Sequence, residues 1–372
     1  MHSILPWVLI GTGLFLAVGT AASLTHSPHW AVRNWDFPRV QIAVAAALCG
    51  FAYGVLYFRG RGWEWAFLAT AAVTVAWQCY KIRPYTHLGS TRVKRATPAA
   101  LERHGDAVLK LLISNVLMEN REHGRFLDLV RRHDPDVVLA LETDAAWARS
   151  LEVLARSHPH TVLRPQENYY GMMLFSRLPL VDPRVRFLVQ DDIPSIHTGI
   201  RLRSGDVVML HGLHPRPPEP IRGQSSTPRD AELVLMGREI GEGNRSVPTV
   251  VAGDLNDVAW SPTSELFLRL SGLLDPRMGR GFFNSFNANN PVLRFPLDHV
   301  FHSNEFELIA LHRLEKVGSD HFPIMIELLH TPEARVVQPE TEKKPGDDEE
   351  AEDRIEEQIE AAATGDDRPA RE

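Results

Sequence analysis

Three long apolar stretches occupy the first eighty residues of this 372-residue chain. Residues 4–24 and 40–58 contain no charged side chain, and residues 63–80 contain only Glu64. Each stretch approaches the roughly 20 residues that an α-helix needs to cross a hydrocarbon core. Tryptophan and tyrosine cluster near their ends, as in interfacial aromatic belts. The sequence therefore predicts a membrane anchor over residues 1–90, with transmembrane helices at about 4–24, 40–58 and 63–80.

Two other interpretations of these stretches stay open. The first stretch could be a signal peptide cleaved near Ala21-Ala22-Ser23, although no basic residue precedes it. The second and third could be buried helices of a soluble core. Their short connection, Arg59-Gly-Arg-Gly, is more typical of a helical hairpin in lipid.

The distribution of Lys and Arg around the stretches predicts their orientation. The connection at Arg59 and Arg61 carries two basic residues, whereas residues 25–39 and 81–95 together carry seven. Because cytoplasmic flanks are enriched in Lys and Arg, the chain after residue 80 is predicted to lie in the cytoplasm.

Charge and cysteine content narrow the chemistry of the rest of the chain. The two cysteines, Cys49 and Cys79, lie in the predicted spans, so disulfides and thiolate sites are excluded beyond them. Residues 331–372 carry a net charge of −9 and are predicted to be a disordered acidic tail, with at most a transient helix around residues 349–362. Residues 96–330 carry a net charge of −5, which gives no basic excess for gripping duplex nucleic acid.

Between a linker at 91–107 and the tail, residues 108–330 alternate strand and helix patterns. Strands are expected first between helices, for example at 108–116 and 136–141, and then mostly in succession from 161 to 211. Further strands are expected at 248–256 and after residue 298. This order predicts an α/β fold with two sheets packed face to face and helices outside.

Polar side chains close the predicted strands of this region. In Pro248-Thr-Val-Val-Ala-Gly-Asp-Leu-Asn256, Asp254 and Asn256 point the same way at the carboxyl end of an apolar strand. A strand followed by an Asx turn is the alternative reading of this segment alone. Six strands closing in this manner are hard to explain as caps; the others end at Asn115, Glu142, His211 or His214, Asp298, and Asp320-His321.

In their order and spacing, these segments resemble the endonuclease/exonuclease/phosphatase superfamily over about residues 108–330. The resemblance rests on Ser114-Asn115, Leu141-Glu142, Tyr170-Gly-Met-Met-Leu-Phe-Ser-Arg-Leu-Pro179, His214-Pro-Arg-Pro, Gly253-Asp-Leu-Asn256, Pro296-Leu-Asp-His299 and Ser319-Asp-His321. It implies a four-layer α/β/β/α sandwich, here preceded by three transmembrane helices. It also implies a membrane-anchored bacterial branch, and so a multi-pass protein of a bacterial inner membrane.

The resemblance also implies a role for each matched residue. Glu142, Asn115 and Asp320 would bind Mg²⁺, with Mn²⁺ as a substitute. Asp254 would orient or deprotonate the attacking water, and the Asp320-His321 pair and His214 would act on the phosphoryl group. Phosphate or substrate would be bound by Asn256, Asp298 and Arg280, the last without a motif that fixes it.

Two histidines compete for the position assigned to His214. His211 and His214 end the same strand, and residues three apart on an extended strand face opposite ways. Only one of them can therefore face the site. In the family that the chain resembles, this histidine is commonly followed closely by a proline, which favours His214.

The predicted reaction is hydrolysis of a phosphate ester by a membrane-anchored Mg²⁺-dependent phosphoesterase, acting on a lipid-linked or small substrate. A membrane-tethered nuclease acting on DNA or RNA is the alternative, and a catalytically inactive membrane adaptor is a third. The chain lacks a Gly-x-Ser-x-Gly elbow, which excludes a serine hydrolase of that type. It also lacks a Gly-x-x-x-x-Gly-Lys loop, which excludes a kinase or nucleotide hydrolase that depends on this loop. The expected partners are the lipid bilayer and the substrate, and no protein partner is evident.

Overall fold

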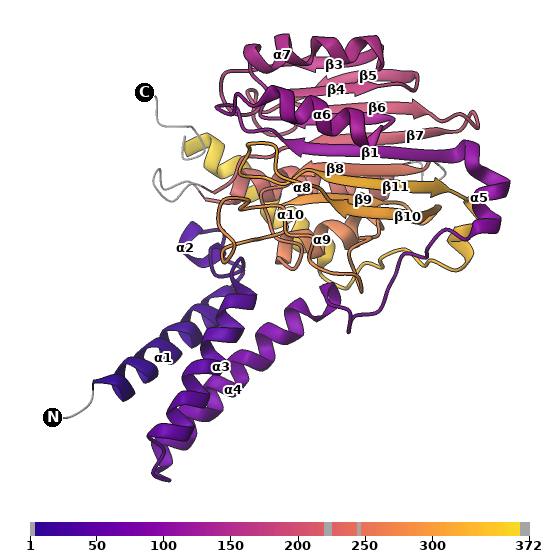
Figure 1. Cartoon of the computed structure of the whole chain (residues 1–372). Helices are drawn as coiled ribbons and strands as arrows, with labels where there is room; N and C mark the ends of the chain where they lie inside the picture. Colours follow the sequence, from indigo (N-terminus) through magenta and orange to yellow (C-terminus); the bar gives the residue numbers. More distant parts are fainter. Residues whose placement is uncertain (1–3, 219–224, 244–246, 365–372) are drawn as a thin grey trace.

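A helical bundle and a two-sheet sandwich make up this protein (Figure 1). The computed structural model describes residues 4–218, 225–243 and 247–364. One sheet has the strand order β10-β11-β1-β2-β4-β3 and the other β5-β6-β7-β8-β9. The strands are β1 Val108–Asn115, β2 Val137–Leu141, β3 His160–Arg164, β4 Met172–Ser176, β5 Leu180–Arg186, β6 Ser195–Arg201, β7 Val207–Leu213, β8 Thr249–Asp254, β9 Asp298–His302, β10 Phe306–Arg313 and β11 Ile324–His330.

Alternating side chains of the strands fill two different layers of the core. On β1, Leu109, Leu111 and Ile113 pack between the sheets, whereas Leu112 packs against the outer helices. On β8, Val250 faces between the sheets and Val251 faces outward. This period of two, with both faces buried, follows from the pleat of a strand covered on each side.

Helices cover the outer face of each sheet and complete four layers. The first sheet is covered by α6 His123–His133 and α7 Ala145–Leu151, which bury Phe126 and Trp147 against it. The second is covered by α8 Thr227–Glu242 and α9 Pro262–Ser271. The predicted α/β fold with two sheets is confirmed.

Two parallel strand pairs align the ends that carry the site. β1 pairs with β2 and β7 with β8 in parallel, while all other described pairs are antiparallel. β1 and β2 also contact β8 across the sandwich. The carboxyl ends of these four strands therefore open at one edge of the molecule.

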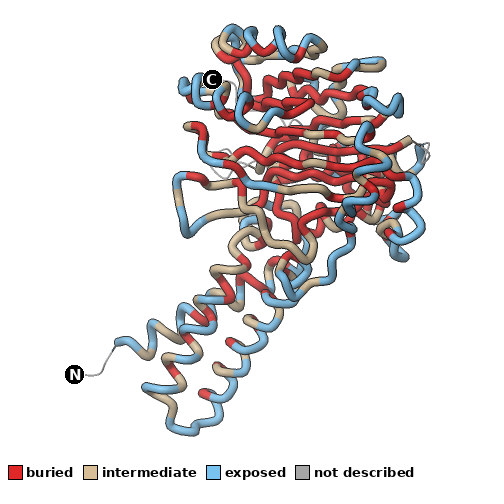
Figure 2. The backbone as a smooth tube through the Cα atoms, turned by 45° about the vertical axis from the view of Figure 1, so that its right-hand side comes forward, coloured by how far each residue is buried: buried red, intermediate tan, exposed pale blue. Residues whose placement is uncertain are grey.

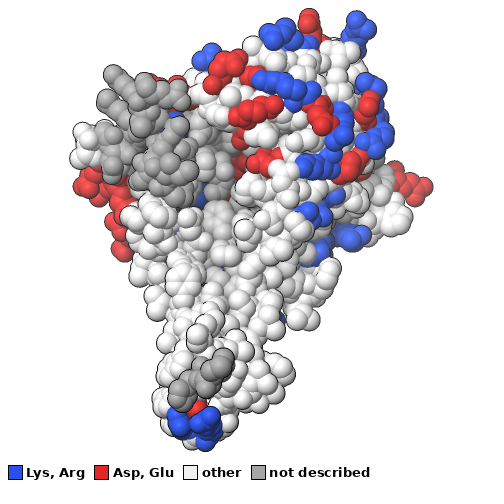
Figure 3. Space-filling view, turned by 60° about the vertical axis from the view of Figure 1, so that its left-hand side comes forward, with Lys and Arg blue, Asp and Glu red and all other residues white. Residues whose placement is uncertain are grey.

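Three long helices form a bundle that projects from the sandwich: α1 Leu5–Ser23, α3 Arg39–Leu56 and α4 Gly62–Ile82. Most of the bundle surface is exposed or half-buried (Figure 2), and it is nearly uncharged except at its far tip (Figure 3). By length and composition, α1 and α3 are apolar enough to cross a membrane. A third transmembrane helix was predicted at about residues 63–80, but α4, which covers this stretch, is not among the helices that meet this criterion.

Polar residues explain the lower apolarity of α4, and they face the bundle interior. Gln78 is buried, accepting from Arg39 Nη1 at 3.0 Å and donating to Thr20 Oγ1 at 2.8 Å. Glu64 accepts from the backbone N–H groups of Arg59 and Arg61 at 2.8 and 2.9 Å. These hydrogen bonds satisfy the polar groups inside an otherwise apolar bundle.

A buried ionic network joins the bundle to the sandwich. Arg33, in the short helix α2 Trp30–Arg33, lies 3.4 Å from both Asp257 Oδ2 and Asp230 Oδ2. Its neighbour Asp36 pairs with both Arg33 and Arg39. All five side chains are almost fully buried, so the bundle is fixed to the domain by charges that have no access to solvent.

An apolar cluster surrounds this network on the same interface. It joins Ile82 and Tyr85 at the end of the bundle to Trp260 and Leu297 of the sandwich, with Phe37 packed against it. Residues 91–107 are also docked: the N–H of Ala96 donates to Leu308 O at 3.0 Å, and α5 Pro98–His104 follows. The segment predicted as a linker therefore packs against the sheet edge.

The prediction of a disordered tail is wrong for residues 332–364. A 3₁₀ helix, Pro332–Val336, is followed by α10 Asp347–Thr364, which packs on α8 and α9. Ala351, Arg354 and Gln358 form its buried face. The acidic residues on which the prediction of disorder rested lie mostly on the opposite, exposed face of α10. The composition averaged over the whole segment therefore did not reveal that the helix has one face that can be buried. Residues 365–372 lie outside the described residues.

Candidate active site

The four aligned strands deliver four polar side chains to one mouth. Asn115 and Asp254 are the last residues of β1 and β8, and Glu142 and His214 directly follow β2 and β7. Glu142 has a φ of 58°, a left-handed conformation that costs a non-glycine residue about 1–3 kcal/mol and is found most often at functional sites.

Close approach of β7 and β8 explains the glycine before Asp254. Gly253 has a φ of 150°, and a Cβ atom there would lie 1.9 Å from Leu213 O. No other residue fits this position without moving the strand. Glycine at position 253 therefore lets β8 lie close to β7 and place the Asp254 carboxylate at the mouth. A larger residue at position 253 would push the strand, and this carboxylate with it, away.

Asn115 bridges the two carboxylates of the mouth. Its Nδ2 donates to Glu142 Oε1 at 2.7 Å and to Asp254 Oδ2 at 3.0 Å. Its Oδ1 accepts from the N–H of Leu117 at 3.1 Å. Both ends of the amide are therefore engaged, and Asn115 holds Glu142 and Asp254 side by side.

Two histidines flank Asp254. His321 Nε2 lies 3.5 Å from Asp254 Oδ2, and His214 Nε2 lies 3.8 Å from the same oxygen. His321 Nδ1 is hydrogen-bonded to Asp298 Oδ2 at 2.8 Å, which fixes the ring with Nε2 toward Asp254. The carboxylate–imidazole pair is oriented as a proton donor to whatever occupies the mouth.

Opposite pKa shifts give the two histidines different charges. Burial lowers the pKa of His321, but the carboxylates of Asp254 and Asp298 outweigh it and raise that pKa to about 10. Burial lowers the pKa of His214 to about 3, so its imidazole is neutral. At neutral pH the mouth thus holds one imidazolium and one neutral imidazole.

Burial shifts the carboxyl groups in the other direction. It raises the pKa of Glu142 to about 7 and that of Asp254 to about 6. Several acidic groups in one dry mouth disfavour full ionisation until a cation enters. The side chains alone therefore lack the positive charge that full ionisation of these carboxyl groups requires.

The residues fit a divalent cation at Glu142. Glu142 Oε2 is buried and has no hydrogen-bond partner among the described residues, and the side chain is still 15% exposed at the mouth. Asp320 is near enough to raise the pKa of Glu142, so a second carboxylate is at hand. One or two carboxylates with waters and substrate oxygens are the ligands that Mg²⁺ prefers.

A second group of donors is less suitable for a metal. Ligand atoms of Asp254, Asp298 and His321 lie within 4.8 Å of one another. However, His321 Nδ1 and Asp298 Oδ2 already share a hydrogen bond of 2.8 Å, so these two ligand atoms engage each other. The short His321–Asp298 contact is better described as an ion pair, which leaves Glu142 as the better centre for a cation.

The structure brings most of the predicted site residues together. Besides those above, Asn256 follows Asp254 in a left-handed conformation and donates its Nδ2 to Pro215 O at 2.9 Å. Arg280 is elsewhere, since its guanidinium donates to Pro276 O and Val93 O. His211 also lies outside, with its Nδ1 2.6 Å from His197 Nδ1, so His214 is the histidine at the mouth.

Several supporting side chains carry no signal strong enough to find them in the sequence. Ser319 Oγ donates to Asn115 O at 2.8 Å and accepts from the N–H of His321 at 3.0 Å, which ties β1 to the last catalytic segment. Arg229 Nη1 donates to Asn256 O at 2.7 Å. Tyr170 packs its ring 5.4 Å from that of His214. Tyr170 and Ser319 belong to two of the motifs that carry the family resemblance, but those motifs assign them no role.

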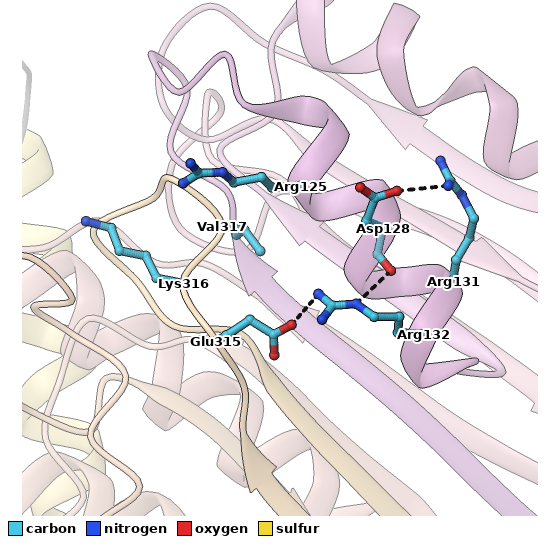
Figure 4. Close-up of a pocket in the computed structure, with 7 residues that line it drawn as sticks. All are labelled: Arg125, Asp128, Arg131, Arg132, Glu315, Lys316 and Val317. Carbon is cyan, nitrogen blue, oxygen red and sulfur yellow. Dashed lines mark hydrogen bonds and ion pairs between the residues drawn. The ribbon is translucent and has the colours of Figure 1, made fainter.

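A separate cavity lies over α6 and the segment before Gly318, and its charges are mostly paired (Figure 4). Arg132 pairs with Glu315, and Arg131 with Asp128 at 2.8 Å. Arg125 pairs with Glu122, the residue that precedes α6. This cavity holds none of the mouth residues and is not the candidate active site.

Solved structures to which part of this chain is similar come from several organisms. An endonuclease/exonuclease/phosphatase from Bacteroides vulgatus is 14% identical with a TM-score of 0.49, covering 60% of this chain and 99% of that chain. One from Beutenbergia cavernae is 20% identical with a TM-score of 0.46, covering 60% and 72%. The human Nocturnin catalytic domain with bound sulfate is 16% identical with a TM-score of 0.47, covering 60% and 95%.

None of the curated proteins compared matches this chain. The model of the Endonuclease/Exonuclease/phosphatase family, by contrast, matches residues 112–321, a segment that contains all of the mouth residues. The match spans more than half of the chain, which therefore belongs to this family and is a metal-dependent phosphoesterase.

Proposed function

We propose that this protein is a membrane-anchored, Mg²⁺-dependent phosphoesterase that hydrolyses a phosphate ester by in-line attack of an activated water. The observation that carries the proposal is the meeting of Glu142, Asn115, Asp254, His214 and the His321–Asp298 pair at one mouth. Carboxylates to hold a cation and orient water, with an imidazolium to stabilise phosphoryl charge, are what this reaction requires.

Each side chain has a distinct task in this proposal. Asp254, with a pKa of about 6, is ionised at pH 7 and basic enough to orient and deprotonate the water. The imidazolium of His321 stabilises the phosphoryl oxygens, and Asp298 keeps it protonated and aligned. Asn256 uses the second hydrogen of its amide nitrogen for a phosphoryl oxygen.

Glu142 and Asp320 would hold the cation, with Asn115 orienting Glu142. A bound Mg²⁺ or Mn²⁺ supplies positive charge that polarises a phosphoryl oxygen. The exposed apolar sides of α1 and α3 support insertion of the bundle, with α4 as a third, partly polar span. The charge distribution around the helices supports a catalytic domain on the cytoplasmic side.

Variants of Asp254 and His321 test the proposal. In full-length protein purified in detergent with Mg²⁺, Asp254→Asn and His321→Ala should each slow hydrolysis by about 10²–10⁴-fold, the usual loss for a positioned acid or base. The exposed residues Asp128 and His312 provide matched controls, and Asp128→Asn and His312→Ala should keep the wild-type rate. Both site residues are almost fully buried and contact other charged groups, so each variant should be assayed at a temperature at which thermal unfolding shows it to be folded.

The substrate panel for this assay contains soluble phosphate mono- and diesters, plasmid DNA, RNA oligonucleotides and phospholipids, each with and without chelator. If nucleic acid were the only substrate cleaved, the protein would be a membrane-tethered nuclease and not the proposed phosphoesterase. Wild-type rates in both site variants, or full activity in excess chelator, would refute the assigned site. Absence of hydrolysis with every substrate would favour an inactive adaptor, against which the intact mouth residues argue.

A further inference from the structure

The loop between α9 and β9 reaches from the active site to the bundle. At its base, the Phe286 ring lies 4.9 Å from the ring of His321, and the N–H of Ala288 donates to Asp320 O at 2.6 Å. At its tip, Val292 O accepts from Gln41 Nε2 at 2.6 Å. Gln41 belongs to the first turn of α3. Residues 287–294 therefore connect the catalytic histidine to the point where α3 begins.

Two apolar side chains are exposed at the tip of this loop. Val292 is 68% exposed and Leu293 is 46% exposed. The base of the loop is firmly packed, because Phe286 and Phe295 belong to the apolar cluster between bundle and sandwich, and the Phe295 ring lies 5.7 Å from that of Phe37. The exposed tip is thus held in place and is not a loosely attached turn.

The outward face of α3 shows where the bilayer would begin. Val44, Leu48, Phe51 and Val55 are all exposed, and their spacing places them along one side of the helix. Gln41 lies about one turn before the first of them. The loop tip, which touches Gln41, is therefore level with the end of the surface that lipid tails would cover.

Three cations surround the same loop. Arg294 and Arg313 place their guanidinium groups 5.0 and 4.5 Å from the ring of Phe322, which directly follows His321. Lys316 contacts Asn289 Oδ1. None of the three forms an ion pair with a carboxylate in the described part of the chain, so their charge is available to anionic groups.

We propose that residues 287–294, with Arg294, Arg313 and Lys316, form a membrane-contact edge that rests in the headgroup layer beside α3. On this basis the substrate is a phosphate ester carried by a lipid of that leaflet. The inference rests on the proposed function of the site. Val292 lies four positions after Ala288, at most about 14 Å of chain, so the mouth lies close to the layer in which lipid phosphates sit. Exposed apolar side chains flanked by cations are typical of surfaces that bind anionic bilayers.

The position of the loop can be tested without any enzymatic reaction. Full-length protein with Cys49 and Cys79 replaced by Ser is labelled with a nitrobenzoxadiazole fluorophore at Val292→Cys and reconstituted into phosphatidylcholine/phosphatidylglycerol vesicles. The label should be quenched by lipids that carry a quencher near the headgroup. A label at Leu163→Cys, an exposed apolar position on the distal edge strand β3, should not be quenched. Equal quenching, or none, at the two positions would overturn the contact edge.

The substrate class is tested by comparing two assays. The wild-type protein should hydrolyse both soluble nitrophenyl phosphate esters and radiolabelled phospholipid in the vesicles. Val292→Asp combined with Leu293→Asp should leave the soluble rate within about twofold and reduce the lipid rate at least tenfold, because the charged tip repels the bilayer while the mouth is untouched. Leu163→Asp is the matched control and should change neither rate.

The outcomes separate the two proposals. Hydrolysis of soluble esters without hydrolysis of lipid, or a lipid rate unaffected by the tip substitutions, would overturn the lipid substrate and leave the phosphoesterase standing. If the wild-type protein hydrolysed neither soluble esters nor lipid, the proposed function would be wrong. The quenching measurement would still show whether the loop contacts the membrane.

Discussion

In the proposed mechanism, a proton and a metal ion would compete for the same oxygen atoms of Glu142. Burial raises the pKa of this carboxyl to about 7, so at pH 6 the metal-free group is mostly protonated and at pH 8 it is mostly ionised. A cation binds the ionised form and must displace the proton. Apparent affinity for Mg²⁺ or Mn²⁺ should therefore fall as the pH drops below about 7, approaching tenfold per pH unit.

Isothermal titration calorimetry at pH 6, 7 and 8 measures this dependence directly. Glu142→Gln should bind weakly at every pH and lose the dependence. Asp254→Asn removes the neighbouring group with a pKa of about 6 and should keep the dependence above pH 6. Affinity that stays constant from pH 6 to 8 in the wild-type protein would contradict the assignment of Glu142 as the metal carboxylate.

Individual site residues were predictable where a strand pattern announced them. Asn115, Glu142, Asp254 and His214 each end an apolar run, and strand geometry alone brings such ends together. The roles of Ser319 and Arg229 were not predictable. A serine or an arginine can donate hydrogen bonds to many different backbone carbonyl groups, and only the folded chain shows which ones are used. Arg280 had no such pattern, and its hydrogen bonds lie away from the mouth.

At the scale of elements, a buried arginine of α10 contributes to attaching the end of the chain to the catalytic domain. Arg354 Nη1 donates to Asp230 Oδ2 at 3.1 Å and to Thr263 Oγ1 at 2.8 Å. Arg354→Met leaves both acceptors with fewer donors in a dry environment, so it should reduce stability by about 1–3 kcal/mol. Thermal unfolding of the full-length protein followed by circular dichroism measures the loss.

Lys343→Met is the control for this change. Lys343 pairs with Asp348 at 2.7 Å in the same part of the chain, but on an exposed surface. Such pairs contribute between about 0 and 1 kcal/mol, so the melting temperature should hardly move. Equal, small effects of both substitutions would show that α10 is not held by its arginine.

Strands and outer helices followed from local patterns, whereas the docking of α10 did not. A period of two between Leu109 and Ile113, or the apolar face of α6, is written in neighbouring residues. The buried face of α10 is short and partly polar, with Arg354 and Gln358 in place of leucines. Its partner, Asp230, is 124 positions away, and nothing local announces that pairing.

For the whole molecule, the charge asymmetry predicts that the catalytic domain is cytoplasmic. Basic residues gather on the domain side of the bundle, and only Arg59 and Arg61 lie at the far tip. A green fluorescent protein fused to the carboxyl terminus should therefore fluoresce, and alkaline phosphatase fused at the same point should be inactive. The same pair of reporters fused after Gly60 should give the opposite result, and an active phosphatase at the carboxyl terminus would reverse the orientation.

The attachment of bundle to sandwich was beyond the reach of sequence patterns. The apolar stretches indicated an anchor followed by a linker, which is an arrangement with independent parts. The structure instead buries Arg33 against Asp257, a pair 224 positions apart. Charged residues are normally solvated, so no pattern in residues 25–39 distinguishes this arginine from an ordinary loop residue.

The Arg33–Asp257 contact also places a requirement on the order of synthesis. At roughly 5–20 residues per second, the 224 positions between them take about 10–45 s to translate, so Arg33 emerges long before its distant partner. During that interval only Asp36 is close enough to balance Arg33 and Arg39. In the proposed membrane-anchored protein, the surplus positive charge would stay at the membrane face and would help to orient the helices. Once the domain folds, Arg33 becomes part of its interior, so one side chain would serve first in insertion and afterwards in assembly.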